Sequence, residues 1–390
     1  MKAKHILLPV ALATTVVSAS AQVTVGGALG FSYEKDRTTP NAVHGMAMTD
    51  GHLNFTAKED LGGGYSATAK SEFASRGRDN TFAPRDATLG LMTPVGLLTL
   101  GSVEADNALI DRGFGGAPIS LPTGLDGGII GGGNKIDVAA FNTKLGGVIL
   151  GVAYSEAGTT DINELADTFS AALTGNAAGN KVPGGPGAGG GPIKAVSLNA
   201  VYDNGPLSIG LGVTQDSVDV SGLRDASAAL LVKAGYEGRI GTSLSASYDF
   251  GFAKVGAGLS TKNKGWATET TFGVSAPLGN ATIGLAYASK TDDSETLGDG
   301  VTANQAAGTL GAAAAQMRTA DVKGSAAKSG FALGMDYKLG KMTGVNVSYG
   351  VYDVKDANRL VNAARVLGGQ SARAMGSVTN EFRIRLMKSF

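Results

Sequence analysis

The chain of 390 residues contains 60 glycines and no cysteine, and its formal net charge is zero. The lack of cysteine excludes disulfides and thiolate metal sites, and the balanced charge gives no indication of a nucleic-acid partner. This glycine content is compatible with disorder, but 43% hydrophobic residues in alternating order argue against it. Length and composition therefore favour one large all-β unit.

Residues 1–21 have the features of a secretory signal peptide. Two early lysines form a short positive region, residues 6–17 are mostly apolar, and Ala-Ser-Ala at 19–21 is a small-x-small cleavage site. The alternative is a membrane anchor, but the apolar run is shorter than the roughly 20 residues that a spanning helix needs. We therefore expect a cleaved signal, followed by one mature domain at residues 22–390.

Apolar and polar residues alternate after this stretch, as in β-strands whose successive side chains point to opposite faces. In the first strand, Val23, Val25 and Phe31 share one face, and the tight turn at 61–64 joins the next two strands. Sixteen strands are predicted, at residues 23–35, 52–60, 64–73, 86–94, 96–104, 134–144, 147–156, 194–204, 206–216, 242–251, 253–262, 268–277, 280–290, 329–340, 344–354 and 380–390.

The connections between these strands alternate between short and long. Short turns fall at 60–64, 94–96, 145–147, 203–206, 250–252, 277–280 and 339–344, and the longest connections at 104–134, 156–193, 290–329 and 356–379. Transmembrane barrels place short turns on the periplasmic side and long loops outside, and they have an even number of strands. The pattern therefore predicts an all-β fold, a transmembrane antiparallel β-barrel of 16 strands.

Aromatic residues gather at both ends of the outward rows. Toward the short turns these are Tyr65, Tyr202, Tyr248, Phe250, Tyr337 and Phe390, and toward the long loops Phe31, Tyr33, Phe73, Tyr154 and Tyr287. Two such belts fit the two membrane interfaces; the alternative is the aromatic core of a soluble barrel. The opposite face is small and polar, as at Thr271, Gly273 and Ser275. Such side chains do not fill a sixteen-stranded barrel, so we expect water inside.

Three stretches and the terminal residue resemble the Gram-negative general porins, most of all those of β-proteobacteria: residues 55–73, 85–102 and 245–262, and Phe390. The resemblance covers nearly all of the mature chain and implies a homotrimer of water-filled pores in the outer membrane, surrounded by lipid and lipopolysaccharide. It also implies a long third loop folded into the pore and recognition of Phe390 by the outer-membrane assembly machinery. The segment 216–243 is longer than the corresponding segment of this pattern, and the glycine-rich stretch 183–192 is unusual for it.

The third loop, residues 104–134, corresponds by resemblance to the pore constriction. It contains Asp106, Asp111 and Asp126 against Arg112, together with many glycines that permit tight backbone paths. A glycine-rich phosphate cradle is the rival interpretation, but the loop lacks the helix start and the Lys-Ser/Thr pair that such cradles require.

Basic residues are expected to face this loop across the lumen. By the alternation these are Lys58, Lys70, Arg383 and Arg385, with Arg76, Arg78 and Arg85 in the second long connection. A basic wall opposite carboxylates favours anions in a narrow pore. Alternatively, these charges hydrate the lumen and pair with Glu34, Glu72 and Glu381. The first alternative predicts a weak anion preference.

Enzymatic and metal-binding functions have little support in the sequence. The mature chain keeps only His44 and His52, no motif places a nucleophile near either, and no cysteine is available as a ligand. We expect no catalytic residues, no metal site and no cofactor. The predicted function is passive diffusion of small hydrophilic solutes and ions; the alternatives are a substrate-selective channel and a structural or adhesive outer-membrane barrel.

Overall fold

The computed structural model describes residues 22–38, 42–75, 82–104, 108–121, 125, 135–157, 193–218, 238–262, 268–291, 328–354 and 378–390. The predicted signal peptide at residues 1–21 lies outside this set. The elements are β1 (Gln22–Thr38), β2 (Ala42–Gly62), β3 (Tyr65–Ser75), β4 (Phe82–Thr93), β5 (Gly96–Glu104), α1 (Ala108–Gly113), β6 (Lys135–Leu145), β7 (Val148–Ala157), β8 (Ile193–Asn204), β9 (Leu207–Val218), β10 (Ile240–Asp249), β11 (Lys254–Lys262), β12 (Glu269–Leu278), β13 (Ala281–Lys290), β14 (Lys328–Lys338), β15 (Thr343–Val354) and β16 (Val378–Ser389).

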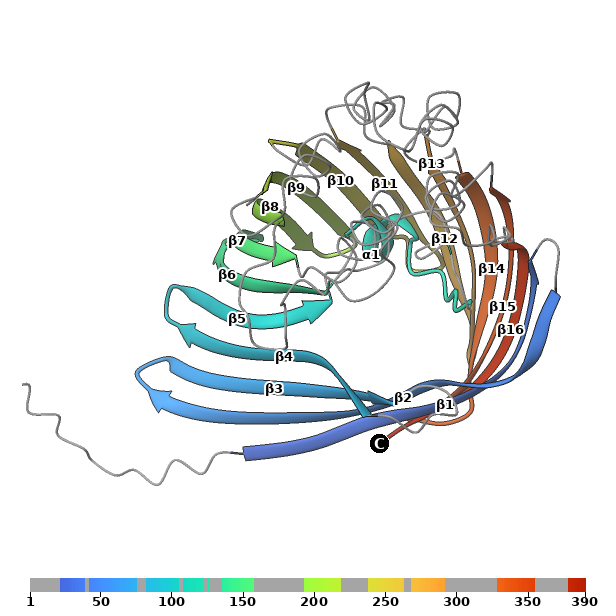
Figure 1. Cartoon of the computed structure of the whole chain (residues 1–390), viewed down its shortest axis with the longest axis horizontal. Coiled ribbons are helices and arrows are strands. Elements are labelled where there is room, and N and C mark those ends of the chain that lie inside the picture. The colour runs from blue at the N-terminus through green and yellow to red at the C-terminus, as the bar shows by residue number, and fades with distance from the viewer. Residues whose placement is uncertain are drawn as a thin grey trace, which may run out of the picture.

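The strands close into one barrel (Figure 1). Each strand pairs antiparallel with the next, and β16 pairs with β1. The predicted sixteen-stranded antiparallel barrel is therefore confirmed. Closure leaves no sheet edge, so backbone groups along the strands pair within the wall, as a membrane requires. Among the described residues, no helix is both long and apolar enough to cross a membrane.

The alternation of side chains separates an apolar outer face from a polar inner face. On β1, Val23, Val25 and Phe31 point outward, and Phe31 is 54% exposed. At alternate positions of the same strand, Ala28 and Ser32 point inward and are buried. The outer face is thus a continuous apolar surface. Exposure of such a large apolar area to water is unfavourable, whereas a lipid bilayer covers it.

Strand β2 begins at Ala42, ten residues before the start that the alternation predicts. Gly30 pairs with Asp50 and Phe31 pairs with Met48, so Thr49 is an extra residue in β2. Such a β-bulge reverses the parity of the residues that follow it. The period of two is broken at Thr49, and the sequence pattern therefore places only the second half of the strand.

The C-terminal residue completes the seam between the last strand and the first. Phe390 N donates to Gly27 O at 3.0 Å, and Gly27 N donates to Phe390 O at 3.1 Å. The aromatic ring lies over Gly27, where a Cβ would be only 2.8 Å from the ring. Lys388, which interrupts the apolar row of β16, is exposed on the outer face opposite Leu29.

Candidate functional site: a constricted barrel lumen

The segment Ala108–Leu121, here called the inward segment, lies inside the barrel (Figure 1). Its helix α1 packs against β9, β10, β11 and β12. Leu109, Phe114 and Leu121 of the segment are buried, and they form one apolar cluster with buried alanines and a tyrosine of the wall, Ala286, Ala288, Ala332 and Tyr352. Burial of these side chains accounts for the position of the segment against the wall instead of across open water.

Glycines on the wall bring the inward segment close to the strands. On four successive strands an added Cβ would collide with the segment: Gly256 with Arg112, Gly273 with Phe114, Gly284 with Ala117 and Gly334 with Pro118. The sequence pattern predicts that the small residues of this face border water. Instead, the inward segment covers Thr271, Gly273 and Ser275, which are all buried.

Side chains of the wall bind the helical end of the segment. Thr271 Oγ1 donates to Leu109 O at 3.1 Å, and Ser275 Oγ donates to Gly115 O at 2.6 Å. Arg112 Nε donates to Ser208 Oγ of β9 at 2.8 Å. These bonds fix the backbone at the start of α1 and just beyond its end, and Arg112 is held against the wall.

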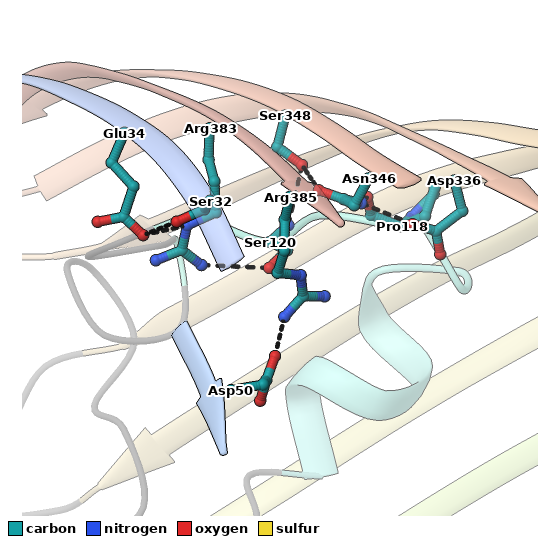
Figure 2. A network of polar contacts seen from close by, with 10 residues as sticks. All are labelled: Ser32, Glu34, Asp50, Pro118, Ser120, Asp336, Asn346, Ser348, Arg383 and Arg385. Atoms are coloured by element: carbon teal, nitrogen blue, oxygen red, sulfur yellow. Dashed lines mark hydrogen bonds and ion pairs between the residues drawn. The ribbon is translucent and has the colours of Figure 1, made fainter. Parts of the chain in front are cut away.

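A second set of hydrogen bonds holds the far end of the segment (Figure 2). Asn346 Nδ2 donates to Pro118 O at 2.9 Å and to Asp336 Oδ1 at 2.7 Å. Ser120 N donates to Ser348 Oγ at 3.0 Å, and Ser348 Oγ donates to Asn346 Oδ1 at 2.8 Å. Because Asn346 and Ser348 are buried, these bonds are made in a largely dry environment, where an unpaired partner is costly.

Two arginines of β16 join this end of the segment to the barrel seam (Figure 2). Arg383 Nε lies 2.8 Å from Glu34 Oε1 of β1, and Arg383 Nη1 donates to Ser120 Oγ at 3.2 Å. Arg385 Nη1 lies 2.5 Å from Asp50 Oδ2 of β2. Arg383 thus has one of the carboxylate partners that the sequence suggests. Asp50 was not foreseen, because it lies next to the bulge at Thr49 and outside the predicted strand.

The two lysines predicted for the lumen lie on the inner face. Lys58 pairs in register with Gln22 and Thr68, and Lys70 with Thr56 and Thr88. Both are exposed, and within the described part of the chain no carboxylate lies at ion-pair distance from either. Arg85, in contrast, contacts Glu72 Oε1 at 3.0 Å. Among the described residues, therefore, no carboxylate neutralises the charge of Lys58 or Lys70.

The carboxylates predicted for the constriction lie outside the described residues: these are Asp106, Asp126 and the side chain of Asp111. The same holds for Arg76 and Arg78 of the second long connection. Of the predicted constriction residues, the structure brings together Arg383 and Arg385 near the far end of the inward segment, and places Arg112 at its helical end. Lys58 and Lys70 lie apart from both, on β2 and β3.

A sequence model of the Gram-negative porin family matches residues 9–357. The chain belongs to the Gram-negative porins. Solved structures with the same fold include trimeric OmpT of Vibrio cholerae, with a TM-score of 0.55 and 12% identity over 95% of this chain and 99% of that chain. A triple mutant of the Rhodopseudomonas blastica porin has a TM-score of 0.52 and 11% identity over 95% of this chain and 100% of that chain. A search of curated protein sequences gave no match.

This porin is an integral β-barrel of the outer membrane, and its lumen is the channel. The inward segment makes its described polar contacts with β9–β16, so it narrows the lumen from that half of the wall. Lys70 on β3 lies half-way around the sixteen strands from β11, against which α1 packs. The lysines and the inward segment therefore lie on opposite sides of the path that a solute takes.

The two histidines that the structure describes lie on opposite faces of the barrel wall. His44 pairs with Lys35 on the outer face, whereas His52 pairs with Ala28 on the inner face. Among the described residues, no group of three or more His, Cys, Asp or Glu side chains is arranged to hold a metal ion.

Proposed function

We propose that this porin is a homotrimeric channel for passive diffusion of small hydrophilic solutes and ions, with a weak preference for anions. Membership of the porin family supports diffusion without a catalytic step. The trimeric form of the similar Vibrio cholerae OmpT supports the trimer. The proposal includes cleavage of residues 1–21, contact with lipid and lipopolysaccharide, and recognition of Phe390 by the assembly machinery.

The anion preference is carried by one observation: Lys58 and Lys70 face the lumen without a carboxylate partner in the described part of the chain. Arg383 and Arg385 contribute less, because each forms an ion pair whose net charge is zero. We assign Arg76, Arg78, Asp106, Asp111, Arg112 and Asp126 to the same constriction on the basis of the sequence.

The strength of the preference follows from the distance between ion and lysine. A unit charge about 8 Å from an ion in water changes its energy by about 0.5 kcal/mol, which corresponds to about a twofold change in population. Salt at physiological strength screens charges over about the same 8 Å. Two lysines on one wall thus favour anions by a small factor and do not exclude cations.

Recordings in planar bilayers test the proposal. Conductance steps in groups of three are expected from a trimer, and the reversal potential in a KCl gradient should give a chloride-to-potassium permeability ratio above one. Replacing Lys58 and Lys70 with Gln should lower that ratio by about twofold per charge. Lys388→Gln, on the outer face, should leave it unchanged. Cation selectivity of the unmodified porin, or an unchanged ratio in the lumen variants, contradicts the proposed preference.

A further inference from the structure

Apolar side chains lie on the inner face of the barrel between β4 and β8. Met92 of β4 pairs with Leu97 of β5, and Ile149 of β7 pairs with Val201 of β8. Met92 is 43% exposed and Ile149 is 39% exposed. The two pairs, which are separated by Asn142 and Lys144 of β6, are here together called the apolar strip. They differ from the lumen faces of the other strands described above, which carry mainly small or charged residues.

The register shows that the apolar strip faces the lumen. Ile149 belongs to the row that continues through Val201 and Gly210 to Ser245, which is buried inside the barrel. Its neighbour Leu150 belongs to the outward row instead. Neither lipid nor the described inward segment accounts for the strip. An apolar patch that no described residue covers, in an otherwise polar lumen, offers contact to the apolar part of a passing solute.

Cations lie at both ends of one row of the strip. Lys144 of β6 is directly opposite Ile149 and is exposed. At the other end Gly210 is directly opposite Val201. Arg112 Nη1 lies 3.2 Å from the position of a Cβ on Gly210. Strands are about 4.8 Å apart, so about 14 Å separates β6 from β9. The row therefore presents an apolar floor between two positive groups.

We propose that the apolar strip binds aromatic carboxylates during their passage through the porin. The ring lies on Ile149 and Val201, the carboxylate pairs with Lys144, and Arg112 supplies positive potential at the opposite end. Charge complementarity selects the carboxylate, and contact with the two branched side chains selects the flat apolar body. This inference rests on the proposed diffusion function and names a preferred class of solute for it.

The test compares two potassium salts across a planar bilayer at pH 8, where both anions are ionised: benzoate on one side and gluconate on the other. Threonine at Val201 and Ile149 keeps much of the side-chain volume and replaces an apolar group by a hydroxyl. The double variant should lower the benzoate-to-gluconate permeability ratio by about fourfold, the factor for about one methylene group of lost apolar contact. Chloride conductance should not change.

Matched variants separate the two parts of the site. Ala153→Thr introduces the same hydroxyl on the inner face of β7, two inward positions beyond Ile149, and should leave the ratio unchanged. Lys144→Gln should lower benzoate and gluconate permeability together, because both solutes carry the carboxylate that the lysine binds.

Several outcomes overturn the inference. An unchanged benzoate-to-gluconate ratio in the double threonine variant shows that the strip does not contact the ring. Block of the chloride current by benzyl alcohol as strong as that by benzoate assigns the strip to neutral aromatic solutes instead. If the porin conducts chloride but shows no preference for benzoate, only the proposed binding of aromatic carboxylates to the strip is contradicted. If it conducts no chloride, the proposed channel function is contradicted as well.

Discussion

The ion pair between Arg383 and Glu34 should stabilise the porin measurably, and a double-mutant cycle tests this. The variants are Arg383→Met, Glu34→Gln and their combination. In Arg383→Met, Glu34 keeps the Ser32 hydroxyl, which donates to it at 2.8 Å, but loses its cation. Ser120 Oγ loses its bond from Arg383 in the same variant. Removing one partner of a largely buried pair leaves the other charge uncompensated, which is the costly case.

The structure sets the expected magnitude. The two side chains are 12% and 22% exposed, with 2.8 Å between Arg383 Nε and Glu34 Oε1. Two unit charges about 4 Å apart attract by about 4 kcal/mol at an effective dielectric constant of about 20. Residual exposure to water and loss of side-chain freedom reduce this value. We expect a coupling energy of about 2 kcal/mol between the two substitutions.

The measurement is urea unfolding of the barrel in lipid vesicles, with the folded fraction read from gel mobility. Arg85 and Glu72 provide a matched control, because their contact is 3.0 Å long but the side chains are 32% and 23% exposed. The corresponding cycle at that pair should give less than about 1 kcal/mol. Additive effects of the Arg383 and Glu34 substitutions, within about 0.5 kcal/mol, would refute the stabilising role of the pair.

Two substitutions of glycine test close contacts elsewhere. Gly27→Val places its side chain against the backbone carbonyl of His52 and the ring of Phe390, and should lower stability by about 2 kcal/mol in the same unfolding assay; Gly26→Ala, whose Cβ has its nearest neighbour at 3.5 Å, should not. Gly273→Val should displace the inward segment and change single-channel conductance while the barrel still folds. Gly340→Ala, with nothing within 4 Å, should conduct normally. Unchanged stability in the first case, or unchanged conductance in the second, contradicts the contact concerned.

The barrel could be predicted from the sequence because each strand carries its own signal. A period of two marks the face of every strand, and turn length marks the side of the membrane. The first half of β2 was missed because the bulge at Thr49 interrupts that period. Asp50, the partner of Arg385, is in phase with His52 but lies just outside the predicted strand. Extending the alternation back by two residues would have found Asp50, and skipping Thr49 would have found the first half of β2.

The inner face was harder to predict, since the size of a residue does not show what covers it. Gly273 is expected to border water from its size alone, yet it lies under the inward segment, as does Gly284. Conversely, Ile149 and Val201 are apolar but face the lumen. Long-range contacts decide both cases, and the local pattern carries no information about them. Arg383 shows the same limit, because its contact with Ser120 spans 263 residues of sequence.

The inward segment gives the two halves of the barrel wall different thickness. From β9 to β16 the wall has a second layer, bound along its length from Arg112 to Ser120, whereas Lys58 and Lys70 belong to strands with no described contact of that kind. A close-packed double layer resists compression more than a single sheet does. We therefore expect lateral pressure from the membrane to deform the strands without a described second layer first. The cross-section of the pore would then change by movement of the wall that carries the two lysines, while the inward segment keeps its position on β9–β16.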